Sequence, residues 1–237
     1  QSMKDLPKFI DALRSLAKSD ASLQVTTNQE TGEALLAGMG ELHLEITTYR
    51  IEEEQNIKVK VSEPIVVYRE AINGNNVGVS FEGKSPNRHN RFYIEVEMLP
   101  QNVVDSLRAG DFRDGTIRNK DQKEIGDQFA ELGMDKDMMR KGYAISGTNV
   151  FINGTKGIQG LHETRELLIE GFNEVCKSGP LAGEPAMGML VRLTDAKLHE
   201  DAIHRGPAQT IPAMRNAMRG AMVRAGTTMM EPMQKLY

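Results

Sequence analysis

Two histidines and two carboxylates occur close together at His199, Glu200, Asp201 and His204, and these are residue types that bind transition metals. Their spacing does not fit the zinc hydrolase motif H-E-x-x-H, whose histidines share one helix face. Histidines five residues apart are about 140° apart around a helix and lie on opposite faces of a strand. We therefore expect no metal site, and His199 is interpreted as a hydrogen-bonded residue at a strand end. A loop could still bring the two rings together, so a zinc-dependent hydrolase remains the alternative of a different class.

A second group of residues matches the phosphate-loop pattern G-x-x-x-x-G-K-[ST], with Gly78, Gly83, Lys84 and Ser85 at the required positions. Such a loop must leave a buried strand and open a helix whose first amides hold the phosphates. Here a proline and a basic stretch that leads into a strand follow Ser85, and no D-x-x-G or N-K-x-D segment occurs downstream. We expect no nucleotide at this loop, and no catalytic residue, metal or cofactor in this chain.

His204 lies between an apolar segment and a helix-forming segment, beside Arg205 and Gly206. We expect its imidazole to be exposed on a tight loop. The positive end of the following helix and the Arg205 charge would favour phosphate oxygens as neighbours. Arg215 and Arg219 are one turn apart and either extend this positive face or form the solvated side of the helix.

A second basic loop carries Lys84, Arg88, His89 and Arg91, and it alternates with asparagines. Such a loop could contact RNA phosphates and sugars without recognising the bases. Alternatively, it is an ordinary loop that leads into a hairpin, and its charges are solvated. Two basic loops in one domain favour an RNA contact. The net charge of -4 argues against a general RNA-binding module, which would bind through widespread positive charge.

The residues before position 72 predict a small α+β domain. The expected elements are a helix capped by Asp5 that ends near Ser19, strands over 23–27 and 34–37 joined by a turn over 28–32, a helix over 42–49 and a strand over 57–61. This order is a ferredoxin-like αββαβ sandwich with its first strand missing. The turn-prone residues 73–76 mark the domain boundary.

The sequence of the second domain predicts alternating strands and helices. The expected elements are a strand over 92–98, a strand within 143–152, a helix over 161–175, a strand over 189–193 and a last helix capped by Thr210, with Met214, Ala217, Met218, Ala221 and Met222 as its buried stripe. The single cysteine, Cys176, cannot form an internal disulfide and is expected to be a buried thiol. Composition and the N-terminal residues favour a cytoplasmic protein without a membrane span, and we expect a monomer.

Several stretches resemble elongation factor 2, the archaeal and eukaryotic ribosomal translocase. They include "ETGEALLAGMGELHLEI", "SEPIVVYREAI", "GKSPNRHNRFYIEVE" and "LHEDAIHRGPAQTIPAMRNAMRGA". The resemblance covers nearly the whole chain. It implies that residues 1–71 form the third domain, 72–225 the fourth domain with a ribosomal protein S5 domain 2-like α/β fold, and 226–237 the start of the fifth. Pro207 and Ala208 replace glycines of eukaryotic members, which points to the archaeal type.

The resemblance also implies partners and a modification. In this family the fourth domain enters the decoding region of the ribosome near tRNA and mRNA, with Lys84, Arg88, His89, Arg91, Arg205, Gly206 and Arg215 as the candidate contacts here. His204 matches the histidine that diphthamide-synthesis enzymes convert to diphthamide. GTP and magnesium belong to the GTPase domain of the intact factor, which these residues do not include. A related translational or spliceosomal GTPase that shares these domains is the nearer alternative.

Overall fold

The computed structural model of the chain describes residues 6–28, 33–63, 66–74 and 78–233. The predicted cap at residue 5, most of the turn over 28–32, part of the break over 73–76 and residues 234–237 lie outside this range. The chain forms two compact units, which divide between Val66 and Val67. The predicted boundary after residue 71 falls instead within strand β3 (Arg69–Ile72), because that strand pairs inside the second unit.

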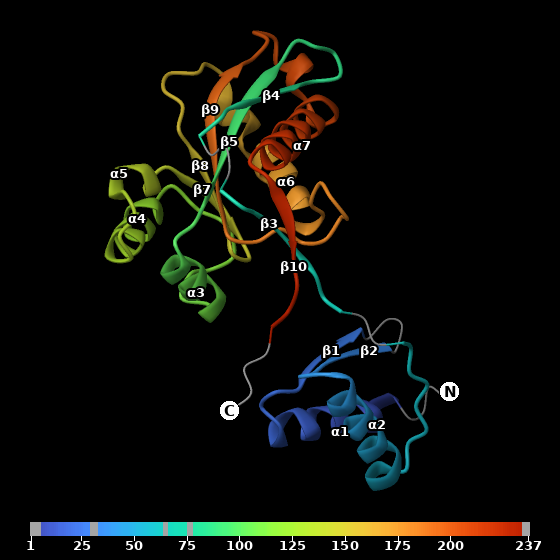
Figure 1. The fold of residues 1–237 in the computed structure, drawn as a ribbon. Helices are drawn as coiled ribbons and strands as arrows, with labels where there is room; N and C mark the ends of the chain where they lie inside the picture. The colour runs from blue at the N-terminus through green and yellow to red at the C-terminus, as the bar shows by residue number, and fades with distance from the viewer. Residues whose placement is uncertain (1–5, 29–32, 64–65, 75–77, 234–237) are drawn as a thin grey trace. The chain divides into compact units, whose positions relative to one another are not determined.

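The first unit contains two helices and an antiparallel hairpin (Figure 1). Its elements are α1 (Leu6–Ser19), β1 (Gln24–Asn28), β2 (Glu33–Ala37) and α2 (Glu41–Gln55). In the hairpin, Val25 pairs with Leu36 and Thr26 with Leu35. The buried core of this unit consists of Leu13, Leu16, Leu23 and Ile51. The predicted helix, hairpin and helix are confirmed.

The strand predicted over residues 57–61 is wrong, because residues 56–63 lie outside any strand. The alternating apolar residues have another cause. Ile57 and Val59 are partly buried against the first core, so the alternation reflects packing of an extended segment. A strand also needs a hydrogen-bonded neighbour, and within the described residues no strand pairs with this segment.

The second unit is built around a six-stranded mixed sheet with the order β4-β5-β9-β8-β7-β6 (Figure 1). The strands are β4 (Phe81–Lys84), β5 (Arg91–Met98), β6 (Gly115–Thr116), β7 (Gly142–Ser146), β8 (Asn149–Asn153) and β9 (Met189–Lys197). Neighbours are antiparallel except β8 and β9, which are parallel and connected through a helix. The single strand predicted within 143–152 is therefore a pair of strands joined by a tight turn.

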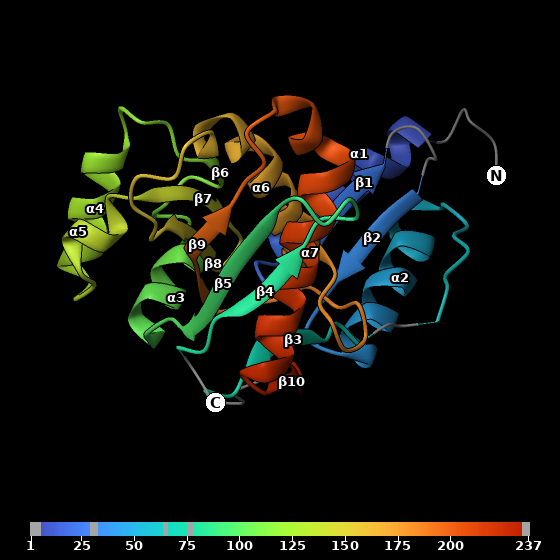
Figure 2. The ribbon, with the colours of Figure 1, turned by 90° about the horizontal axis from the view of Figure 1, so that it is seen from above.

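Helices cover both faces of the central strands, as Figure 2 shows from above. They are α3 (Gln101–Ala109), α4 (Gln122–Glu131), α5 (Lys136–Met139), α6 (Leu161–Lys177) and α7 (Pro207–Arg224). Along β8, Phe151 belongs to the core under α6 and α7, whereas Val150 and Ile152 belong to a second core with α3 and α4. A strand buried on both faces is expected to be apolar, and the three central residues of β8, Val150, Phe151 and Ile152, are.

Helix α7 buries the methionine stripe that the sequence predicts, with Met214, Met218 and Met222 inaccessible to solvent. The predicted cap is wrong. Gly206 precedes the helix and Pro207 opens it, while Thr210 is buried in the first turn. The Thr210 hydroxyl donates to the Arg205 carbonyl oxygen at 2.8 Å, so Thr210 ties the helix to the preceding segment.

Strands β3 and β10 (Thr227–Met230) form a separate antiparallel ribbon in the second unit. Residues 227–230, predicted to start a fifth domain, pair here with the strand through which the chain enters the unit. Glu70 on β3 is fully buried, and its carboxylate accepts hydrogen bonds from the backbone amides of Leu181, Ala182 and Glu184.

Cys176 is buried on α6, as predicted, and burial raises the pKa of its thiol above the ordinary value. Such a thiol behaves as a small apolar side chain. Across the described residues, no helix has the length and apolar character required to cross a bilayer.

Candidate functional site

The candidate site lies where two segments distant in sequence meet at one end of the second unit. The first is the turn between β4 and β5, residues 85–90. The second, residues 198–206, leads from β9 to α7 and contains a 3-10 helix over Ala202–Arg205. Hydrogen bonds from Asn87 and Asn90 to the His204 carbonyl oxygen, at 3.1 and 2.7 Å, join the two segments. We call these two segments the tip.

Three imidazoles contact one another at the tip. The ring centroids of His199 and His204 are 4.5 Å apart, and His89 lies 5.0 Å from the first ring and 5.2 Å from the second. The loop therefore brings together two histidines that a regular helix or strand would separate. Because the other rings cover part of its surface, His204 is half-buried rather than exposed as predicted.

The ring cluster is not a formed metal site. Within the part of the chain that the structure describes, no group of three or more metal-ligating side chains is arranged to hold an ion. The zinc hydrolase alternative therefore has no formed centre in these residues. His199 follows the end of β9, and its backbone amide donates to the Asn90 carboxamide at 3.1 Å. The interpretation of His199 as a hydrogen-bonded residue at a strand end agrees with this contact.

Arg205 does not provide the exposed charge that the sequence predicts. Arg205 is only 8% exposed to solvent, and its guanidinium pairs with Glu163 Oε2 at 2.5 Å. The guanidinium also lies against Gly160, at the start of α6. Arg205 therefore fastens the 3-10 helix to α6, and its charge is neutralised inside the unit.

The basic residues of the β4–β5 hairpin differ in their surroundings. Lys84 and Arg91 both pair with Glu82, at 3.1 Å in each case. The hydrogen bond from Lys84, more than those from Tyr93 and the nearby charges, lowers the pKa of Glu82. Arg88 is exposed, has a left-handed φ of 62°, and forms no ion pair with any described residue. Arg88 is thus the hairpin cation most available to an external phosphate.

Arg215 and Arg219 face α6 rather than the tip. Arg215 pairs with Glu174 at 2.9 Å, and Arg219 donates to the Ser178 carbonyl oxygen at 3.1 Å. Arg215 is eight residues into α7, about 12 Å along the axis from the first residue. The predicted extension of a positive face along α7 is therefore not what the structure shows.

The residues that follow the phosphate-loop pattern form a turn and not a helix, as expected, whereas Gly83 and Lys84 lie in a strand that was not predicted. Gly83 and Lys84 end β4, and Ser85 begins the turn into β5. A methyl group on Gly83 would collide with the Ala213 carbonyl oxygen and with Ala217 on α7. This glycine is thus required for packing of the strand against the helix.

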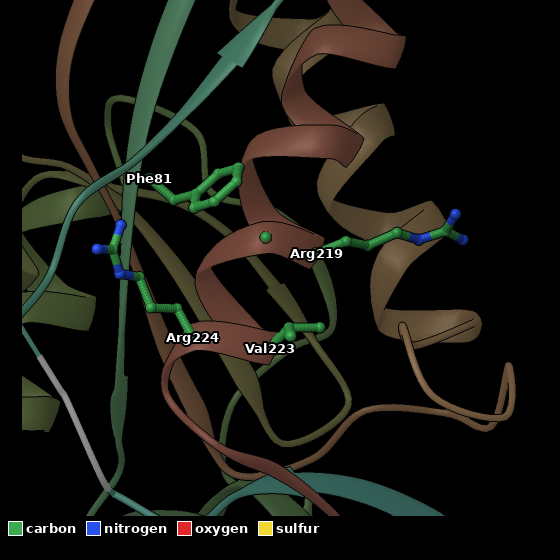
Figure 3. Close-up of a pocket in the computed structure, with 5 residues that line it drawn as sticks. Phe81, Arg219, Val223 and Arg224 are labelled. Carbon is green, nitrogen blue, oxygen red and sulfur yellow. The ribbon is translucent and has the colours of Figure 1, made fainter.

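A shallow apolar depression of about 490 Å³ lies near the other end of α7. It is lined by Phe81, Arg219, Gly220, Val223 and Arg224, and Figure 3 shows the Phe81 ring beside the helix. Its lining residues include none of the tip histidines, so the depression and the tip are separate features.

Comparison with known proteins identifies the family. The model of elongation factor G domain III matches residues 1–63, and the model of its domain IV matches residues 114–226. Elongation factor 2 of Picrophilus torridus is 55% identical over 233 residues, and that of Methanoregula boonei is 52% identical over 236. These matches cover 98% and 100% of the chain. The chain belongs to the elongation factor 2 family.

The chain spans about a third of the length of these relatives, 31% and 32% respectively. Elongation factor 2 of Pyrococcus furiosus, 50% identical over 236 residues, gives the same coverage of 32%. All three relatives are archaeal, which agrees with the type inferred from Pro207 and Ala208. The family match covers domains III and IV, and the 198–206 segment of the tip lies in the part that matches domain IV.

Sequence reasoning missed the polar residues that build the tip. Asn87 and Asn90 read only as spacers between basic residues, and Glu82 and Glu163 gave no signal as partners of Lys84, Arg91 and Arg205. The strand pairing of β4 with β5 could have placed Glu82 opposite Tyr93 and near Arg91. The contacts from the hairpin to His204 cross more than 100 residues of sequence and have no local pattern.

Proposed function

We propose that this chain supplies the part of an elongation factor 2 that enters the decoding region of the ribosome while tRNA and mRNA move after peptide transfer. The observation that carries this proposal is the tip, where His204 contacts His89 and the exposed Arg88 precedes His89 in the same turn. A cation without an internal partner is available to RNA phosphates. The relatives that match the whole chain are all named elongation factor 2, which supports the same function.

We propose that His204 carries the diphthamide modification when the synthesis enzymes are present. In support, the residue lies at the end of the 3-10 helix with part of its ring accessible. A cationic extension from this ring would add positive charge at the tip, where Arg88 is exposed, and would strengthen contacts to phosphate.

We infer a division of roles among the other predicted contacts. Arg88 and His89 are exposed and would meet RNA directly, whereas Lys84 and Arg91 would do so while bound to Glu82. Arg205 and Arg215 would act indirectly, through their ion pairs with α6. GTP hydrolysis, with GTP and magnesium, belongs in this proposal to other domains of the factor, so these residues act mechanically rather than as an enzyme.

The finer fold assignment is part of the same proposal. The order of α1, β1, β2 and α2 supports a ferredoxin-like third domain. The mixed sheet with a parallel β8–β9 pair connected through α6 supports an S5 domain 2-like fourth domain. Such a factor would work as a monomer in the cytoplasm, where ribosomes are found.

The proposal is tested in the parent factor with purified ribosomes. Arg88→Ala is expected to slow translocation about tenfold or to reduce reading-frame accuracy, because a phosphate contact is lost. Arg108→Ala is the matched control, since it removes an exposed arginine of the same unit that lies on α3, outside the tip. Translocation at an unchanged rate and frame after replacing both Arg88 and His204 by alanine would contradict the role of the tip. Tandem mass spectrometry of the natively expressed factor tests the modification of His204.

A further inference from the structure

The Asn90 carboxamide holds both ends of the segment that carries two of the tip histidines. Asn90 is fully buried, its Nδ2 donates to the His204 carbonyl oxygen at 2.7 Å, and its Oδ1 accepts from the His199 amide at 3.1 Å. A carboxamide has one accepting oxygen and a donating nitrogen, and each faces the matching backbone group. The side chain therefore closes the chain between His199 and His204.

The turn that carries Asn90 is itself fixed. The Ser85 amide donates to the Asn90 carbonyl oxygen at 3.0 Å, and the Asn90 amide donates to Ser85 Oγ at 2.9 Å. Ser85 is also buried. Because both the amide and the carbonyl oxygen of Asn90 are hydrogen-bonded to Ser85, the backbone that carries the carboxamide is fixed.

Asn87 completes the arrangement. Its Nδ2 donates to the same His204 carbonyl oxygen at 3.1 Å, and its Oδ1 accepts from the His89 amide at 3.1 Å. Its own amide donates to Gln209 Oε1 on α7 at 2.9 Å. The two asparagines therefore bind the backbones of all three histidines whose rings contact one another.

We infer that Asn87 and Asn90 are positioning residues that set the three-imidazole arrangement and the direction in which His204 is presented. The hydrogen bonds from both carboxamides to the three histidines go to backbone groups, so both act through the backbone. Replacement by aspartate keeps the size and the accepting oxygen but removes the donor, and it places a carboxylate against the His204 carbonyl oxygen. Each replacement removes one of the two donors to the His204 carbonyl oxygen and sets a repelling carboxylate oxygen against it, so the segment should shift away.

The test measures ring contacts by NMR in the full chain. Only five histidines occur, so histidine-selective labelling gives a simple spectrum. Asn90→Asp is expected to abolish the nuclear Overhauser contact between the His199 and His204 rings, and Asn87→Asp to weaken that between His89 and His204. If Asn90→Asp does not fold, Asn87→Asp decides the matter, since Asn87 is less buried. Unchanged ring contacts in the folded variants would overturn the inference.

Asn149 provides the matched control. It is equally buried on β8, where Nδ2 donates to the Ala186 carbonyl oxygen at 2.8 Å and Oδ1 accepts from the Met189 amide at 3.2 Å. Asn149→Asp makes the same chemical change away from the tip and should lower stability while leaving the ring contacts intact. Loss of the ring contacts in Asn149→Asp as well would show a general structural effect and overturn the specific role.

A second readout rests on the proposed function. When the chain is produced together with diphthamide-synthesis enzymes, Asn90→Asp is expected to reduce the modified fraction of His204 about tenfold relative to Asn149→Asp. Equal modification in both variants would overturn the positioning role for that reaction. Absence of modification in the unaltered chain would instead contradict the proposed modification of His204, and the ring contacts would still decide the role of the asparagines.

Discussion

At the scale of single residues, Asp20 gives a prediction about acid stability in the first unit. Its pKa is lowered from 3.8 to about 2, first by the Ser22 hydroxyl and amide and then by His43. A carboxylate with a lowered folded-state pKa stabilises the fold above the unfolded-state pKa, and this stabilisation is lost as the pH falls through the folded-state pKa. Asp20→Asn should therefore lower the free energy of unfolding at neutral pH, and the difference from the unaltered chain should close between about pH 4 and pH 2.

Urea unfolding followed at several pH values measures this difference. The control is Asp11→Asn, because that side chain is 79% exposed and its nearest arginine atom lies 3.9 Å away. Exposed pairs of this kind contribute little. A constant difference between Asp20→Asn and the unaltered chain from neutral pH down to pH 2 would rule out the carboxylate as its source.

The residue types in the sequence predicted where the tip lies, but they did not predict which contacts its side chains make. The sequence singled out His204, His89 and Arg88, and the structure places the His89 ring against His204, with Arg88 next to His89 in the same turn. Whether a charge is free depends on tertiary partners, and sequence spacing carries no information about them. Arg205 was expected to contact RNA but pairs with Glu163, which comes from a helix about 40 positions earlier.

At the scale of elements, two glycines at the contact between β4 and α7 should respond differently to alanine. A methyl group on Gly83 would meet backbone atoms of Ala213 and Ala217, which cannot move without shifting α7. A methyl group on Gly220 would meet the Phe81 ring, a side chain beside the apolar depression that can rotate. We expect Gly83→Ala to cost about 1–3 kcal/mol, because overpacking forces backbone shifts.

Gly220→Ala is the matched variant. It should stay within about 1 kcal/mol of the unaltered chain, since alanine is the better helix former. Chemical denaturation of both variants measures the free energies of unfolding. Equal costs for the two glycines would contradict the distinction between a rigid and a movable neighbour.

The buried carboxylate of Glu70 gives a prediction about the ribbon of β3 and β10. Glu70→Gln replaces one accepting oxygen by a donor, so at least one of the three amides that it binds loses its partner. The expected cost is about 1–3 kcal/mol, with faster hydrogen exchange at Leu181, Ala182 and Glu184. Glu97→Gln on β5, whose partner Arg192 is partly exposed, should cost less than about 1 kcal/mol. Unchanged exchange in the 181–184 loop after Glu70→Gln would show that the carboxylate does not hold it.

Helices and strands could be predicted from the sequence where one face is buried and the apolar residues repeat over enough positions to define the period. The methionine stripe of α7 and the alternation of β5 are such cases, and both are confirmed. The segment at 57–61 also alternates, yet a strand is defined by its neighbour, which the local pattern does not contain. The turn within 143–152 was missed although the turn-forming residues Ser146, Gly147, Thr148 and Asn149 separate the two apolar runs, so this error was one of reading and not of missing signal.

At the scale of the whole molecule, each unit has a core made of its own residues. The first core includes Leu13, and the larger core under α6 and α7 includes Leu168, and both leucines are inaccessible to solvent. Removing a buried leucine side chain costs about 2–5 kcal/mol. If the units unfold separately, as units with separate cores commonly do, each leucine should stabilise only its own unit.

Leu13→Ala is therefore expected to accelerate amide hydrogen exchange in residues 6–63 and to leave the six-stranded sheet protected. Leu168→Ala, which removes the same atoms from the other core, should do the reverse. Because the first unit has far fewer buried apolar residues among those described, it should also be the first to unfold on heating. Faster exchange in both units after either substitution would mean that the two cores form one cooperative system, and the tip would then depend on the first unit for its stability.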